Sequence, residues 1–380
     1  MNLKDRVLNR GPKKILALDG GGIRGLITVE ALVHIEQMLR ERQQAGPNFV
    51  LSDYFDFVAG TSTGAIIAAC VALGMPAPQI RDFYLESGKE MFDRANILKR
   101  LRYKFEDEKL ARKLKEVFGA DTQLGSDKLR CVLMIVTRNV TTDSPWPISN
   151  NPFAKYNATD RDDCNLKLPL WQLVRASTAA PTYFPPEEVK IGSRRFVFVD
   201  GGVTPYNNPA FLAFLMATSR PYRMGWKTGE SEMLLISIGT GSSANANTDL
   251  DPDRMHIIYN ATTIPGALMY GALNQQDMLC RVFGKCLAGD PIDRELGDMI
   301  GTDTTSELIG TLGPVDPKLF TYARYNVDLT HAGLEALGVK NVDPEHIQLL
   351  DSVQYMGELQ TVGCALAANR VKSEHFAGFA

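Results

Sequence analysis

The sequence of 380 residues has no apolar run close to the ~18 residues that cross a bilayer, so we expect no membrane-spanning helix. The first residues, Met1 to Arg6, lack the apolar core of a secretory signal, so we expect no signal peptide. Lys and Arg number 41 against 44 Asp and Glu, which argues against a nucleic acid polymer as partner. We therefore predict a cytoplasmic protein, with peripheral attachment to the inner membrane surface as the alternative.

Cysteine and histidine are scarce and scattered. The six cysteines include no C-x-x-C pair, and no histidine stands near them at ligand spacing, so we predict neither a metal nor a cofactor. Cys70 and Cys131 sit in apolar runs and are expected as small core side chains. Cys280 and Cys286 are expected as near neighbours on one helix. The oligomeric state does not follow from the sequence.

Strand and helix patterns alternate in the first 75 residues. Lys14 to Leu18 is a short apolar run that ends at Asp19 and three glycines, which predicts a buried strand. From Leu26 to Arg40 apolar residues recur every three or four positions, which predicts an amphipathic helix. Tyr54 to Ala59 and Ala65 to Leu73 repeat the strand and the helix. This alternation predicts an α/β protein with a mainly parallel sheet flanked by helices.

The rest of the chain continues the same pattern. Pro145 to Lys155 is expected as an irregular loop, and the segment from Ile264 onward as helix. No repeat or low-complexity linker is present, so we predict one domain over residues 1–380, with a core at about 14–240 and a mainly helical part at about 255–380. Three further strands are predicted, at Cys131 to Thr137, Phe196 to Val199 and Leu234 to Ile238.

Gly60-Thr61-Ser62-Thr63-Gly64 fits the pattern G-x-S-x-G. A serine on a sharp turn between a strand and a helix holds its hydroxyl toward a substrate, and flanking glycines tolerate the crowding. The following helix directs its N–H groups and positive dipole end at the site. The pentapeptide alone arises readily by chance, and a plain turn in which Ser62 caps the helix is the alternative. Its setting between an apolar strand and a small-residue helix favours Ser62 as a nucleophile.

A second motif, Asp-Gly-Gly-Gly-Ile-Arg-Gly, extends from Asp19 to Gly25. Consecutive glycines between a strand and a helix leave backbone N–H groups unobstructed, as an oxyanion hole requires, and Arg24 can add charge or hold the loop. The glycine spacing also fits the G-x-G-x-x-G pattern of a dinucleotide site. Such a site needs an acidic residue after a second strand about 20 residues on, where Gln43 to Pro47 is a predicted loop instead.

A third motif, Asp200-Gly201-Gly202, follows an apolar strand. A carboxylate there can accept the Ser62 proton and return it to the leaving group. Burial would raise its pKa from near 4 to a more useful range. A turn or cap aspartate is the alternative. A triad with histidine also stays open, although neither His256 nor His331 follows a predicted strand. The other histidines are His34, His346 and His375.

In this order the three motifs resemble the patatin-like phospholipase family. Asp19 to Gly25 is similar to the family's D-G-G-G-x-R-G loop, and Gly60 to Gly64 to its G-x-S-x-G elbow. Asp200 to Gly202 is similar to its D-G-[GA] motif, and Ala176 to Pro181 to its block before that acid. The resemblance spans about residues 14–240.

This resemblance implies a three-layer patatin-like fold and a Ser–Asp dyad without histidine, metal or cofactor. It implies that Ser62 is the nucleophile and Asp200 the base in the cleavage of acyl esters of membrane lipids through an acyl-enzyme. The backbone N–H groups that it assigns to the oxyanion hole, with support from the Arg24 side chain, are those of Gly20, Gly21 and Gly22.

Two further hypotheses concern partners. Arg324-Tyr325-Asn326 is similar to bacterial members of the family, some of which are antiphage effectors activated by cyclic nucleotides. A ligand-gated effector with a small-molecule activator is therefore the second functional hypothesis, although no nucleotide-binding residue can be named. Between Lys89 and Lys115, ten Lys or Arg stand against five Asp or Glu, interleaved with aromatic residues. This stretch is a candidate for peripheral contact with anionic lipid, and a solvated helix face is the alternative.

Overall fold

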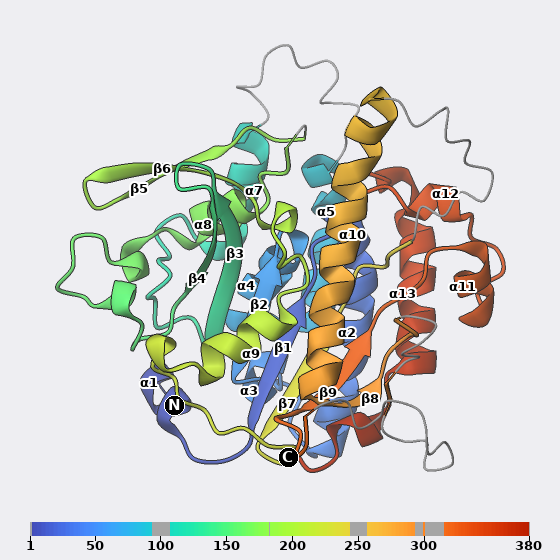
Figure 1. Cartoon of the computed structure of the whole chain (residues 1–380), viewed down its shortest axis with the longest axis horizontal. Helices are drawn as coiled ribbons and strands as arrows, with labels where there is room; N and C mark the ends of the chain where they lie inside the picture. Colours follow the sequence, from blue (N-terminus) through green and yellow to red (C-terminus); the bar gives the residue numbers. More distant parts are fainter. Residues whose placement is uncertain are drawn as a thin grey trace.

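One sheet organises the molecule. The computed structural model describes residues 2–92, 107–181, 183–243, 257–292, 299–300 and 315–379. Within these residues nine strands form a sheet in the order β5-β6-β3-β2-β1-β7-β9-β8, and β4 pairs with β3 (Figure 1). The strands are β1 Lys13–Leu18, β2 Phe57–Thr61, β3 Val132–Asn139, β4 Ser144–Ser149, β5 Glu187–Ile191, β6 Arg194–Asp200, β7 Met233–Ile238, β8 Lys285–Ala288 and β9 Thr321–Tyr325.

The pairing is mainly parallel, as predicted. The five ladders that link β3, β2, β1, β7, β9 and β8 are parallel, whereas β4, β5 and β6 pair antiparallel. The carboxyl ends of the parallel strands therefore lie at one edge of the sheet, which we call the carboxyl edge. Ligands of open α/β sheets bind outside this edge.

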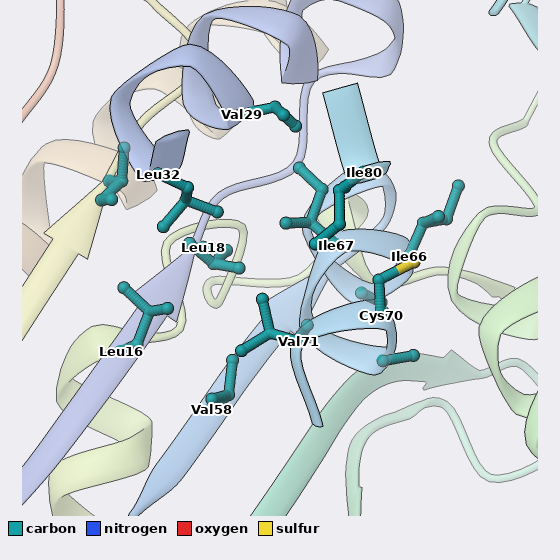
Figure 2. Packing of buried hydrophobic residues seen from close by; sticks show 14 of the residues in the cluster. Leu16, Leu18, Val29, Leu32, Val58, Ile66, Ile67, Cys70, Val71 and Ile80 are labelled. Atoms are coloured by element: carbon teal, nitrogen blue, oxygen red, sulfur yellow. The ribbon is translucent and has the colours of Figure 1, made fainter. Parts of the chain in front are cut away.

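Helices cover both faces of the sheet. The described helices are α1 Leu3–Leu8, α2 Gly25–Arg42, α3 Leu51–Tyr54, α4 Thr63–Ala72, α5 Ala77–Phe92, α7 Asp107–Phe118, α8 Leu170–Ser177, α9 Ala210–Thr218, α10 Ile257–Phe283, α11 His331–Ala336, α12 Pro344–Ile347 and α13 Met356–Arg370. Leu16 and Val58 pack with residues of α2 and α4 on one face, as Figure 2 shows. Ile15 and Ala17 pack with α9 on the other face. Because successive strand residues point to opposite faces, the continuous apolar strands are buried on both sides, and the three-layer α/β fold is confirmed.

Some predicted boundaries are wrong. Tyr54 ends α3, and the second strand begins only at Phe57. Tyr54 and Phe55 are as buried and apolar as the strand residues that follow, so an apolar run could not mark where the strand begins. Pro145 to Lys155 is not wholly a loop, because its first residues belong to β4. This strand pairs only with β3, and at an edge proline loses no ladder hydrogen bond. Cys286 lies in β8 rather than on the helix of Cys280.

The last third of the chain does more than add helices. Its strands β8 and β9 extend the sheet next to β7, and α13 packs against α2. Among the described residues, no helix combines the length and the apolarity needed to span a membrane. The basic stretch from Lys89 to Lys115 includes the end of α5 and most of α7, and its residues 93–106 lie outside the described part of the chain.

Candidate active site

Ser62 occupies the turn between β2 and α4, with φ 55° and ψ −123°. This conformation is strained for a residue with a side chain. The flanking glycines make the turn possible, since a Cβ at Gly60 would lie 2.1 Å from the Gly64 carbonyl oxygen, and one at Gly64 would lie 2.3 Å from the Leu18 carbonyl oxygen. The Ser62 side chain makes no capping hydrogen bond to α4, so the helix-cap alternative is wrong.

Strand register brings the acid to the serine. β6 pairs antiparallel with the end of β3 and places Asp200 opposite Thr137. β2 pairs parallel with the preceding residues of β3 and places Thr61 opposite Val136. The ends of β2 and β6 therefore meet beside adjacent residues of one strand. At that point the Ser62 hydroxyl donates a hydrogen bond to Asp200 Oδ2 over 2.6 Å.

The surroundings of Asp200 favour a base. The residue is only 4% exposed, and its Oδ1 accepts a hydrogen bond from the Gly202 N–H over 2.6 Å. Burial raises the pKa of Asp200 to about 6, although the hydrogen bonds from Ser62 and Gly202 and the charge of Arg175 act in the opposite sense. Such a carboxylate is ionised at neutral pH and is a stronger base than an ordinary aspartate.

This pKa sets an expected pH dependence. Only the ionised Asp200 carboxylate can accept the Ser62 proton, so kcat/KM for ester hydrolysis should rise about tenfold per pH unit below pH 6 and level off above it. The profile can be measured with a water-soluble p-nitrophenyl ester. A kcat/KM that decreases as the pH rises through 6 would contradict the assignment of Asp200 as base.

Stability should change in the opposite direction over the same pH range. The pKa of Asp200 is raised from 3.8 to about 6 in the folded state, so between these values the folded chain holds a proton that the unfolded chain has released. The contribution of Asp200 to the free energy of unfolding therefore falls as the pH rises through this window, by on the order of 3 kcal/mol. The ionised Asp200 carboxylate is thus maintained at a cost in stability.

Ser177, the last residue of α8, links the turn at Ser62 to strand β3. Its hydroxyl accepts a hydrogen bond from the Ser62 N–H over 2.9 Å and donates one to the Val136 carbonyl oxygen over 2.6 Å. Sequence reasoning gave it no role. The only signal was its place in the block Ala176 to Pro181, which is similar to the family pattern. This contact uses the Ser62 N–H, so that group is not free to bind an oxyanion.

The glycine loop lies against the turn. A Cβ at Gly20 would lie 3.1 Å from Ser62 Cβ, which brings the predicted oxyanion loop next to Ser62. The Gly20 N–H, however, donates to the Asn207 carbonyl oxygen over 3.2 Å and is occupied in this structure. In the described part of the chain, the N–H groups of Gly21 and Gly22 have no protein acceptor. Of the three N–H groups predicted as oxyanion donors, those of Gly21 and Gly22 therefore remain candidates.

Arg24 anchors the loop to the last third of the chain. Its Nη1 donates to the Gln348 carbonyl oxygen over 3.2 Å, and the Ile23 N–H donates to the Leu350 carbonyl oxygen over 3.0 Å. Burial lowers the pKa of Arg24 to about 10, so the side chain stays charged at neutral pH. These contacts fit the supporting role predicted for Arg24.

Arg324 of β9 fixes the start of the loop and was not predicted as a site residue. Its guanidinium forms a buried, two-bonded ion pair with Asp19 and also donates to the Ser237 hydroxyl over 2.7 Å. Burial alone would lower the pKa of Arg324, but the Asp19 carboxylate outweighs it and raises that pKa. Thr240 holds the next residue, since its hydroxyl donates to the Gly20 carbonyl oxygen over 3.0 Å.

Asp200 caps the short 3₁₀ turn Gly201–Val203 through the Gly202 N–H, so the cap role holds together with its contact to Ser62. The histidine triad and the dinucleotide site have no support in the described residues. There no histidine is hydrogen-bonded to Ser62 or Asp200, whereas His375 bonds to the Tyr325 hydroxyl; His256 lies outside the described residues. The glycine spacing is explained without a dinucleotide, because Cβ atoms at Gly21 and Gly22 would collide with Thr240 and Leu350. In the described ranges no three His, Cys, Asp or Glu side chains are grouped as metal ligands would be.

The fold and the hydrogen-bonded pair define an α/β protein with a serine on a strained strand-to-helix turn at the carboxyl edge of its sheet. The sequence model of the patatin-like phospholipase family matches residues 16–214. The chain belongs to this family.

Individual relatives are more distant. A cGAMP-activated phospholipase of Vibrio cholerae is 30% identical over 60% of this chain and 64% of its own length. Patatin-like protein 4 of Arabidopsis thaliana is 34% identical over 62% of each chain. This chain thus spans somewhat less than two thirds of these relatives. VipD from Legionella pneumophila superposes with a TM-score of 0.36 and 13% identity, covering 93% of this chain and 67% of that one.

Proposed function

We propose that this protein is a serine-dependent lipid acyl hydrolase of the phospholipase A type, which cleaves acyl esters of membrane lipids. The observation that carries the proposal is the 2.6 Å hydrogen bond from the Ser62 hydroxyl to the buried Asp200 carboxylate at a strained strand-to-helix turn. Membership of the patatin-like phospholipase family supports the lipid ester as substrate class.

The acylation step follows from this geometry. Asp200 Oδ2 accepts the proton as Ser62 Oγ attacks the ester carbonyl carbon. The negative charge that develops on the carbonyl oxygen is stabilised by the N–H groups of Gly21 and Gly22 and by the amino-terminal end of α4. When the tetrahedral intermediate collapses, the bond to the leaving alcohol breaks and this alcohol takes the proton from Asp200. The acyl group stays on Ser62.

Deacylation repeats the same steps with water. Asp200 accepts a proton from a water molecule that attacks the acyl carbon, and the same donors bind the second oxyanion. Collapse of this intermediate breaks the bond to Ser62 Oγ, and the proton returns from Asp200 to Ser62. A free fatty acid leaves. No group beyond the dyad is needed to balance the protons.

The proposal can be tested with phosphatidylcholine vesicles in ¹⁸O-labelled water. Early in the reaction, mass spectrometry should detect fatty acid and lysophospholipid in equal amounts, with ¹⁸O from the solvent in the fatty acid carboxylate. Release of phosphocholine or of free choline would instead indicate cleavage of a phosphoester bond and would refute acyl hydrolysis.

A second candidate function is hydrolysis gated by a small-molecule activator. The observation that favours it is the 30% identity to a Vibrio cholerae protein named as a cGAMP-activated phospholipase. Under this hypothesis, labelling of Ser62 by a fluorophosphonate is slow in the protein alone and faster after addition of cGAMP. Equal labelling rates with and without cGAMP would remove gating by that nucleotide.

A further inference from the structure

Helix α10 contains a long stretch without charge. From Ile257 to Gln276 the sequence has no Asp, Glu, Lys or Arg, and the first charged residue is Asp277. A helix whose outer face lies in water ordinarily carries charged residues on that face. Asp277 itself is buried and accepts a hydrogen bond from the Tyr322 hydroxyl of β9 over 2.9 Å. The charge-free stretch therefore ends where the helix reaches the sheet.

The stretch lies on the same side of the sheet as the dyad. α10 ends at Phe283, and the parallel strand β8 begins two residues later, so the helix runs antiparallel to the strands and begins on the side of the carboxyl edge. A helix of 27 residues is about 40 Å long, whereas a six-residue strand such as β7 spans about 20 Å. The amino-terminal half of α10 must then extend beyond the sheet, as Figure 1 shows for its upper end.

Apolar side chains on this half are exposed. Leu268 is 69% exposed and Ile264 is 50% exposed. Among the described side chains from Thr263 to Gln275, none is buried. Val203, three residues after Asp200 in the chain, is also 39% exposed. Two separate elements thus present apolar surface on the side of the sheet at which the nucleophile lies.

We infer that the amino-terminal half of α10 inserts into the boundary between headgroups and acyl chains of a lipid bilayer and docks the dyad on its substrate. The inference rests on the proposed function, because a membrane lipid as substrate requires a bilayer at the carboxyl edge. Two copies of this helix packed side by side would bury on the order of 600 Å², below the roughly 1,200 Å² of a stable protein interface. A bilayer is therefore a better partner for this surface of α10 than a second copy of the chain.

The absence of charge predicts how the surface binds. An uncharged helix binds through buried apolar area, so attachment should need no anionic lipid and should persist at high salt. The basic stretch between Lys89 and Lys115 would produce the opposite behaviour, because its attraction to anionic lipid is screened by salt.

The test uses the full chain with Ser62→Ala, so that vesicles are not degraded. Co-sedimentation with phosphatidylcholine vesicles should be equal at low and high salt, and Leu268→Asp should weaken it by about tenfold or more. Leu8→Asp is the matched control, because Leu8 is 64% exposed but lies in α1, just before β1 begins at the opposite edge of the sheet. It should bind like the parent protein.

A second measurement locates the helix in the bilayer. The fluorescence of Leu268→Trp should be quenched by brominated phosphatidylcholine, whereas that of Leu8→Trp should not. Binding of Leu268→Asp at parental strength, or loss of binding at high salt, would overturn the inference. Light scattering that shows a dimer dissociated by Leu268→Asp would assign the surface to a second copy instead.

These results separate the two claims. Vesicle binding by the Ser62→Ala protein without fatty acid release by the wild type would refute the proposed function and leave the docking surface standing. Hydrolysis of a water-soluble ester by the wild type without vesicle binding would refute the docking surface and leave ester hydrolysis standing.

Discussion

Ser62→Ala is expected to lower the rate of lipid ester hydrolysis by about 10⁴-fold or more. Two hydroxyls beside it in the described part of the chain are engaged, because Thr63 Oγ1 is within hydrogen-bonding distance of the Tyr84 hydroxyl at 2.5 Å and the Ser177 hydroxyl is bonded at both ends. Alanine keeps the backbone conformation at φ 55° without a new clash, so the chain should still fold, although Asp200 Oδ2 loses its Ser62 partner. Fatty acid release from phosphatidylcholine vesicles measures the effect.

The matched control is Ser373→Ala, since Ser373 is exposed and lies near the end of the chain, after α13. It should keep full hydrolysis and full labelling by a fluorophosphonate, whereas Ser62→Ala should lose both. Turnover that survives Ser62→Ala in a folded protein would mean that another group attacks the ester, and the dyad assignment would fail.

Ser62 and Asp200 could be singled out from the sequence because each stands in a local motif. Ser62 follows an apolar strand and is flanked by glycines at fixed spacing, and Asp200 ends an apolar strand before two glycines. Local sequence thus identified two strand ends with suitable chemistry. It could not show that they meet, because that depends on the pairing of both β2 and β6 with β3. The family resemblance supplied this step.

The supporting residues could not be predicted for the same reason. Arg324 lies 305 residues from Asp19, and Ser177 lies 115 residues from Ser62. Neither residue type is unusual in its own strand or helix, so no local pattern marks it. The occupied Gly20 N–H is a similar case, since its acceptor is the Asn207 carbonyl oxygen, and any residue at that position has one. One further pattern was visible in the sequence, because the first twenty residues of α10 contain no charged residue, which is unusual for a helix that faces water.

Asp200→Asn is expected to lower hydrolysis by about 10²–10⁴-fold, the usual contribution of a positioned general base. An amide has the size of a carboxylate, but its single oxygen can accept only one of the two hydrogen bonds that Asp200 takes from Ser62 and Gly202, and it cannot take up the proton. The variant should therefore fold, label slowly with a fluorophosphonate, and lose the rise of kcat/KM near pH 6 that Asp200 produces. The missing pH dependence separates a base from a residue that only positions Ser62.

The control for Asp200→Asn is Asp56→Asn, which changes a carboxylate at the opposite edge of the sheet, where Asp56 accepts a hydrogen bond from the Lys14 N–H over 2.9 Å. It should keep the rise near pH 6 even if it lowers stability. Asp200→Glu provides the complementary comparison, because it retains a carboxylate but moves it toward Ser62 by one methylene. It should recover part of the rate together with a pH-dependent rise. If Asp200→Asn retained that rise, another group would have to accept the Ser62 proton, and the hydrogen bond at 2.6 Å would only orient the hydroxyl.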